Sequence, residues 1–387
     1  MVLFERNQDP QGNDAEYRFF TEFQSHEPEF DYLKSLEIEE KINQIKWLKR
    51  RNNSHFLLTT NDKTIKLWKV SNRRVRADTA PASTGPAGAP KVPSAATLEW
   101  RTESRSKRSF ANAHAYHINS VSINCDDETF LSADDLRVNL WNLSVNDASF
   151  NIVDIKPENM EELTEVITSA SFHPTQCNVF MYSSSKGAVK LSDMRAAALC
   201  DQHSKVFFED QAADPANRSF FSEIISSISD VKFSHDGQYF FARDYLTIKV
   251  WDVRNEKAPV NTFNVHEHLR PKLCDLYEND CIFDKFEACW SGDDKQLMSG
   301  SYHNLFNVFE RESGNEICLE ASRDNIQGPT HRLNAVNIMP GSAQRLERDQ
   351  IYVDDMDYNM KIMHAAWHPG RDILALAATN NLYLYRR

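Results

Sequence analysis

A short strand pattern that recurs along the whole chain limits what this sequence can fold into. In each copy apolar and polar residues alternate, and three copies end in a tryptophan followed by a polar residue, at Trp68, Trp141 and Trp251. The copies occupy residues 2–6, 64–70, 137–142, 188–194, 247–253, 305–310 and 381–386. Alternation with a period of two predicts strands that each have one face against a core.

A second feature precedes these strands at a similar separation. It is an aromatic or apolar residue that the best copies follow with Ser-His or His-Pro. Clear copies lie at 170–174, 231–235 and 365–369, and weaker ones at 45–47, 121–123 and 288–290. A third apolar strand, such as 179–184, lies between the two features. Repeated units of three strands and a variable fourth are typical of propeller blades.

One such unit cannot bury both of its faces, so the units must stack and close into a ring. Trp251-Asp252 is the dipeptide of WD repeats, and Trp68-Lys69 and Trp141-Asn142 are degenerate forms of it. A β-sandwich would not explain why the His-Pro element repeats. The sequence therefore predicts an all-β protein, a single domain over residues 1–387 that is a seven-bladed WD-repeat β-propeller.

The two ends of the repeat differ from the middle. Residues 2–6 match the third strand of a blade, so we expect the first blade to be incomplete at the N-terminus. The last copy, 381–386, is also a third strand, with no fourth strand after it. We therefore expect an open or strained closure between the first and last blades.

Composition narrows the class of function. A net charge of −12 argues against nucleic-acid binding, which needs a basic face. The chain shows neither an apolar stretch of membrane-spanning length nor a secretory signal. Seven scattered cysteines favour buried reduced thiols over disulfides or a zinc site. We expect a protein that binds neither nucleic acid nor membrane, in the cytoplasm or also the nucleus.

The motifs of catalysis are missing from the sequence. The 11 glycines form no phosphate-binding loop, and no Gly-x-Ser-x-Gly elbow is present. His266 and His268 lack the third ligand of a metal site. His173, His235 and His368 recur at one repeat position, which predicts structural hydrogen bonds within a blade. The prediction is a protein without catalytic residues, metal or cofactor.

Two insertions interrupt the repeat, and insertions are where function concentrates. Residues 71–109 are rich in Pro, Ala and Gly and end in the basic residues Arg101, Arg105, Lys107 and Arg108. This composition is typical of a solvated linker, with a mobile arm that grips a partner as the alternative. Residues 320–358 form a polar insertion before the last blade.

Acidic clusters fall mostly between the predicted strands. They lie at 37–40, 126–128, 134–135, 158–162 and 278–280. Each cluster alone is typical of a solvated turn. Together, on the flat face of a propeller, they could form one acidic surface that attracts basic peptides.

Four stretches go beyond a generic WD repeat: 23–43, 150–168, 217–235 and 276–287. They closely resemble the B regulatory subunits of protein phosphatase 2A, the fifty-five-kilodalton class. The resemblance covers nearly the whole chain from about residue 17. A WD-repeat interaction platform in another assembly is the alternative, and it would give no reason for these stretches.

The resemblance implies a non-catalytic subunit that joins a helical-repeat scaffold subunit and a catalytic subunit in a heterotrimer. The family's propeller recruits phosphoprotein substrates with basic segments to an acidic groove. The positions that match this groove are Glu39, Glu40, Lys41, His117, Asp135, Leu163, Phe220, Phe221, Asp280, Phe283 and Lys285. The family also has a long hairpin arm that grips the scaffold, whereas residues 71–109 are short and do not match it residue by residue.

Overall fold

The computed structural model describes residues 1–6, 17–31, 35–50, 52, 54–76, 98–202, 205–209, 220–321 and 356–386. Its contacts divide the chain into two compact units. The first comprises Met1–Ile118 and Asn142–Ala148, and the second comprises Asn119–Trp141 and Ser149–Arg387. In the described part of the chain, no helix is long and apolar enough to cross a membrane.

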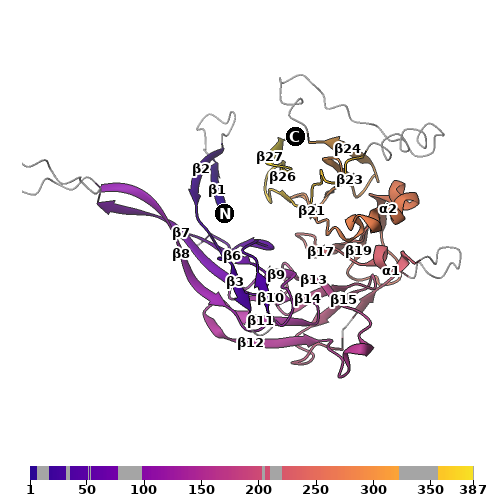
Figure 1. Cartoon of the computed structure of the whole chain (residues 1–387), viewed down its shortest axis with the longest axis horizontal. Helices are drawn as coiled ribbons and strands as arrows, with labels where there is room; N and C mark the ends of the chain where they lie inside the picture. Colours follow the sequence, from indigo (N-terminus) through magenta and orange to yellow (C-terminus); the bar gives the residue numbers. More distant parts are fainter. Residues whose placement is uncertain are drawn as a thin grey trace, which may run out of the picture. The chain divides into compact units, whose positions relative to one another are not determined.

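Within each sheet, strands that follow one another in the chain lie side by side (Figure 1). The first eight are β1 (Val2–Arg6), β2 (Tyr17–Glu22), β3 (Glu29–Asp31), β4 (Leu36–Ile38), β5 (Gln44–Trp47), β6 (Ser54–Thr60), β7 (Ile65–Arg76) and β8 (Leu98–Phe110). The next eight are β9 (Ser120–Ile123), β10 (Thr129–Ala133), β11 (Arg137–Asn142), β12 (Val145–Asp154), β13 (Ile167–Phe172), β14 (Val179–Ser184), β15 (Val189–Asp193) and β16 (Lys205–Phe207).

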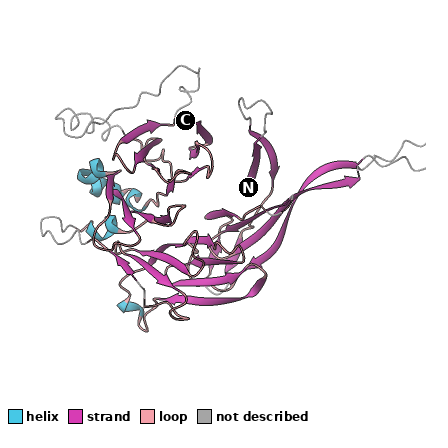
Figure 2. Ribbon diagram, turned by 180° about the vertical axis from the view of Figure 1, so that it is seen from behind, coloured by secondary structure: helices cyan, strands magenta, loops and turns pink. Residues whose placement is uncertain are grey.

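The remaining strands are β17 (Asp230–Phe233), β18 (Tyr239–Arg243), β19 (Thr247–Asp252), β20 (Asn261–Asn264), β21 (Ala288–Trp290), β22 (Gln296–Gly300), β23 (Leu305–Glu310), β24 (Glu316–Glu320), β25 (Ala365–Trp367), β26 (Ile373–Ala378) and β27 (Asn381–Arg386). Among the described residues, helical turns lie in the connections between sheets (Figure 2). They are η1 (Met160–Glu162), α1 (Ser222–Ser226), η4 (Glu267–Lys272), α2 (Leu273–Glu278) and η5 (Cys281–Phe283).

Six of the sheets have the form of a propeller blade. Five have four strands each, β5–β8, β9–β12, β13–β16, β17–β20 and β21–β24, and the sixth has the three strands β25–β27. The predicted all-β WD-repeat propeller is therefore confirmed, but the predicted count of seven blades is wrong for the described residues.

The count fails at the start of the chain. Residues 2–6 do form the predicted strand β1, but its partner among the described residues is β2 alone, so the two make a ribbon rather than a blade. The ribbon packs Leu3 and Phe23 against Leu57 and Trp68. An incomplete first blade and a single domain over residues 1–387 stay predictions.

An Asx residue ends the second strand of three blades and shapes the turn that follows. Asn61 accepts hydrogen bonds from the backbone N–H groups of residues 63 and 64. Asp134 does the same for residues 136 and 137, and Asp244 for residues 246 and 247. These bonds satisfy turn donors that the sheet cannot reach.

The recurrent tryptophans are buried and join the second and third strands. The Nε1–H of Trp68 donates to Thr59 over 3.2 Å, and that of Trp141 donates to Ser132 over 2.8 Å. Trp251 packs instead against Phe207 and Phe240. A buried indole N–H usually needs such a partner, which Thr59 and Ser132 supply in these two blades.

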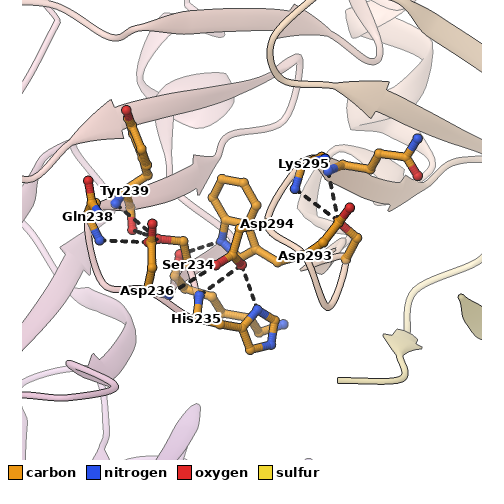
Figure 3. A network of polar contacts seen from close by, with 12 residues as sticks. Ser234, His235, Asp236, Gln238, Tyr239, Asp293, Asp294 and Lys295 are labelled. Atoms are coloured by element: carbon orange, nitrogen blue, oxygen red, sulfur yellow. Dashed lines mark hydrogen bonds and ion pairs between the residues drawn. The ribbon is translucent and has the colours of Figure 1, made fainter. Parts of the chain in front are cut away.

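Two of the repeated histidines, His173 and His235, contact the next blade along the chain, and Figure 3 shows the contact of His235. His173 Nε2 lies 3.1 Å from the carbonyl oxygen of Gly237, in the next blade along the chain. His235 Nδ1 lies 2.6 Å from Asp294, again in the next blade. Asp294 also raises the pKa of His235 through that hydrogen bond. The predicted bonding within a blade holds for His368, whose Nδ1 accepts from the N–H of Gly370, and for His173, whose Nδ1 accepts from the N–H groups of Thr175 and Gln176. The contacts of His173 and His235 with the next blade were not predicted.

The two insertions are described only at their borders. β7 and β8 stay paired from Ile65↔Phe110 out to Arg76↔Leu98, so both borders of the 71–109 insertion are strand. Residues 77–97 lie outside the described residues. Most of the predicted polar insertion, residues 322–355, also lies outside them.

Candidate functional site

In the second unit, two connections between sheets carry helical turns. α1 precedes β17, and η4, α2 and η5 lie between β20 and β21. None of these elements is long enough to be stable alone, so packing must hold them in place. Ile225, Leu273, Leu276 and Ile282 supply that packing, because all four are buried in one cluster with Tyr302.

Four aromatic rings gather on the outside of this cluster, and we call them the aromatic patch: Phe220, Phe221, Tyr277 and Phe283. Ring centroids lie 5.3 Å apart for Phe220 and Phe221, 5.6 Å for Phe220 and Tyr277, and 5.8 Å for Tyr277 and Phe283. Phe220 is 71% exposed and Phe283 57% exposed. Clustered exposed rings of this kind make the patch a candidate interaction site.

The charged side chains on the patch-bearing elements are all acidic. α1 carries Glu223, α2 carries Asp275 and Glu278, and Asp280 precedes η5. All four residues are exposed. Asp280 also has a left-handed backbone, with φ of 58°, which turns the chain sharply between α2 and η5. The patch therefore combines apolar rings with negative charge.

Lys285 links the patch to the ends of the neighbouring sheets. Its Nζ donates to the carbonyl oxygen of Thr168 in β13 over 2.7 Å. Burial lowers the pKa of this ammonium, while the carboxylates of Asp230, Glu287 and Asp135 act to raise it. Asp135 is half-buried in the turn between β10 and β11, where its carbonyl accepts from the N–H of Ile167.

Leu163 lies in the connection between β12 and β13, and β13 is the strand that Lys285 contacts. It is half-buried at the end of η1, and its N–H donates to the carbonyl of Met160. Seven of the predicted site residues thus belong to the second unit: Asp135, Leu163, Phe220, Phe221, Asp280, Phe283 and Lys285.

The other four predicted residues form a group of their own in the first unit. Glu39, Glu40 and Lys41 follow β4 and are exposed. The side chain of Asn61 donates to the carbonyl of Glu39 over 3.2 Å. The neighbouring Asp62 lies 3.8 Å from the exposed ring of His117. One turn after β6 therefore holds both parts of this group.

The described residues include no group of three or more His, Cys, Asp or Glu side chains that could hold a metal ion. The seven cysteines are all free thiols.

Comparison with known proteins assigns the chain to a family. Residues 105–142 and 221–252 match the family model described as WD domain, G-beta repeat. Over its whole length the chain is 57% identical to the Protein phosphatase PP2A 55 kDa regulatory subunit of Drosophila melanogaster, and the alignment covers 79% of that relative. The chain belongs to the PP2A 55 kDa regulatory subunit family.

Membership decides between the two functions that the sequence left open. A PP2A regulatory subunit on a WD-repeat propeller is a non-catalytic interaction protein, as predicted, rather than an enzyme. The alternative of a WD-repeat platform in another assembly is set aside.

The residue that sequence reasoning missed in this PP2A-type subunit is Tyr277. Its ring joins Phe283 to the two phenylalanines of α1. A signal was present: Leu273 and Leu276 are spaced as the buried side of a helical turn, and that spacing places Tyr277 on the outer side.

Proposed function

We propose that this regulatory subunit recruits phosphoprotein substrates through the aromatic patch and its surrounding carboxylates. A segment that carries Lys or Arg beside apolar residues would match both features, because its cations meet Glu223, Asp275, Glu278 and Asp280 while its apolar side chains cover the rings. The carrying observation is the joining of Phe220, Phe221 and Phe283 by Tyr277 into one exposed surface.

The proposal includes a heterotrimer with a helical-repeat scaffold subunit and a catalytic subunit, in the cytoplasm or nucleus. A substrate docked on the patch would then meet the active site of the catalytic subunit at a high effective concentration. Asp135, Leu163 and Lys285 would extend the docking surface toward the neighbouring sheets. Glu39, Glu40, Lys41 and His117 would form a second contact region on the first unit.

The β7–β8 ribbon is the proposed contact with the scaffold. The guanidinium of Arg74 lies 4.7 Å from the centre of the Trp100 ring, and Trp100 is 66% exposed. Trp and Arg are the residues most often found as binding hot spots. The side chains of Thr102 and Asn72 are hydrogen-bonded across the ribbon at 2.8 Å, which supports the two strands between this pair and the sheet.

Co-expression with the scaffold and catalytic subunits, followed by size-exclusion chromatography, tests the assembly. The three chains should co-elute. A phosphorylated protein with a basic segment should then be dephosphorylated faster by the trimer than by the scaffold and catalytic subunits alone. Failure to co-elute would refute the heterotrimer.

Two variants test the patch. Phe220→Ala with Phe283→Ala should weaken substrate capture by about tenfold or more, since truncation of an exposed hot-spot ring costs more than about 1 kcal/mol. Phe150→Ala is the matched control, because Phe150 is 68% exposed but lies on β12. Asp135→Lys tests the extension of the surface. Equal substrate capture by the patch and control variants would refute the proposal.

A further inference from the structure

Beneath the aromatic patch lies a buried polar group that we call the hub: Tyr245, Asp284, Tyr302 and Lys361. Asp284 uses both carboxylate oxygens, with Oδ1 2.5 Å from Lys361 Nζ and Oδ2 3.0 Å from the Tyr302 hydroxyl. The Tyr302 hydroxyl also lies 2.7 Å from the carbonyl oxygen of Cys281 and 3.0 Å from the Tyr245 hydroxyl. The side chains of Tyr245 and Tyr302 are buried.

The hub joins segments that are far apart in the chain. Tyr245 lies between β18 and β19, Tyr302 between β22 and β23, and Lys361 just before β25. The segment that carries Lys361 is fixed to the Tyr302 loop by backbone hydrogen bonds. One runs from the N–H of Ile362 to the carbonyl of Ser301 over 3.0 Å, and others join residues 303 and 304 to residues 357 and 360.

The last residue of η5 and the two residues after it point to three different partners. Phe283 turns outward into the aromatic patch, Asp284 turns inward to the hub, and Lys285 reaches Thr168. Phe283, Asp284 and Lys285 are consecutive, so the directions of their side chains depend on one stretch of backbone. The inward direction of Asp284 therefore constrains the directions of Phe283 and Lys285. The contacts of Asp284 therefore determine how this edge of the patch is presented.

Energetics make Asp284 the decisive member. Its side chain is only 13% exposed, and a carboxylate is costly to bury without a cation and hydrogen-bond donors. Without Lys361 and the Tyr302 hydroxyl, the inward position of Asp284 would be unfavourable. η5 has three residues, which is too short to keep its conformation unaided.

We propose that Asp284 is a positioning residue for substrate docking, which acts through the hub to hold Phe283 in the outward orientation that meets the docked segment and Lys285 on the Thr168 carbonyl. This inference rests on the proposed function of the patch. It concerns a residue that does not itself face the docked segment. The negative charge of Asp284 would attract a basic segment, but this carboxylate pairs instead with Lys361 inside the protein.

The test compares two Asp→Asn variants of the full chain. Asp284→Asn removes the carboxylate from the hub, and Asp294→Asn removes a carboxylate from the pair with His235, between β21 and β22. Both are assayed with a fluorescein-labelled helical peptide of about twenty residues that carries Lys and Leu on adjoining faces. Fluorescence anisotropy gives its Kd, and hydrogen exchange reports on residues 279–286.

We expect Asp284→Asn to weaken peptide binding by about tenfold and to speed exchange at 281–283, whereas Asp294→Asn leaves both readouts at the wild-type level. Tyr302→Phe, which keeps the ring, should act in the same direction and serves if Asp284→Asn does not fold. If the wild type binds the peptide and neither hub variant binds it more weakly, the positioning role of Asp284 is refuted while the docking function stands. Faster exchange without weaker binding would refute the positioning role in the same way. Absence of wild-type binding would instead refute the proposed docking function.

Discussion

Gly237 offers a sharp test of how neighbouring blades are held together. It has a φ of +71°, and a Cβ added to it would lie 2.3 Å from Cε1 of His173. Gly237→Ala therefore introduces two separate costs. The first is the free-energy cost of a left-handed backbone conformation for alanine, and the second is displacement of the His173 ring.

The two costs can be estimated separately. The left-handed conformation costs an alanine about 1–2 kcal/mol. The displaced ring gives up its hydrogen bond to the carbonyl of Gly237, a loss of about 0.5–1.5 kcal/mol. It also gives up its contact with Phe233, at 4.9 Å between centroids, for about another 0.5–1.5 kcal/mol. Together they predict a loss of roughly 2–5 kcal/mol in the free energy of unfolding.

Gly314 supplies the matched control. Its φ is +72°, and no atom lies within 4 Å of an added Cβ. Gly314→Ala should therefore show the backbone cost alone. Urea unfolding of both variants, followed by tryptophan fluorescence, measures the difference, which should be about 1–3 kcal/mol. His173→Ala should remove most of that difference in the Gly237 variant. Equal losses in the two glycine variants would refute the reasoning.

Three further predictions concern the polar groups of His26, His235 and Trp141. Burial lowers the pKa of His26 from 6.5 to about 4, so its stabilising contribution is complete above pH 6.5 and is lost as the pH falls toward 4. That loss is at most roughly 3 kcal/mol. If His26 is the cause, the urea midpoints of wild type and His26→Gln should differ at pH 7 and converge at pH 4.5. The raised pKa of His235 acts in the opposite sense, with stability that is present below pH 6.5 and lost as the pH rises through its folded pKa. Separately, Trp141→Phe should lower the free energy of unfolding by about 1–3 kcal/mol because the Ser132 hydroxyl loses its donor, while Trp100→Phe, on the exposed ribbon, should leave it unchanged. A similar loss in both tryptophan variants would contradict this account.

The repeat made the strands of the blades predictable, because alternation marks the residues that face a core. The strand that ends at Trp141 and its partner strand with Ser132 follow from alternation and from the need to satisfy an indole N–H. The blade count did not follow. A strand pattern such as 2–6 specifies which residues face a core, but not how many strands will pair beside it, and here β1 has one partner among the described residues.

The candidate site was predictable in its members and not in its arrangement. The resemblance supplied Phe220, Phe221 and Phe283, and the spacing of Leu273 and Leu276 places Tyr277 on the outer side of its helical turn, but that spacing does not specify that Tyr277 links the rings of the two segments. The hub was harder still. Asp284 and Lys361 are far apart in the chain, and their pairing depends on where the 357–362 segment runs beside the Tyr302 loop. Such contacts depend on tertiary packing rather than on local pattern.

In the second unit, one series of contacts between blades lies at the end of the strands opposite to the candidate docking residues. The turns between the first and second strands of neighbouring blades contact one another in series. The Asn124 side chain donates to the Cys177 carbonyl, His173 binds Gly237, and His235 binds Asp294. Gly292 lies against Pro369, whose carbonyl oxygen would be 2.5 Å from a Cβ added to the glycine. In a meander of antiparallel strands, turns between the second and third strands, and connections to the next blade, leave from the other end. Asp135, Leu163, the aromatic patch and Lys285 all lie in those turns and connections. A substitution of the outer rings of the patch would therefore leave these turns untouched, whereas Asp284 and Lys285 also join blades at the docking end and are less free to change.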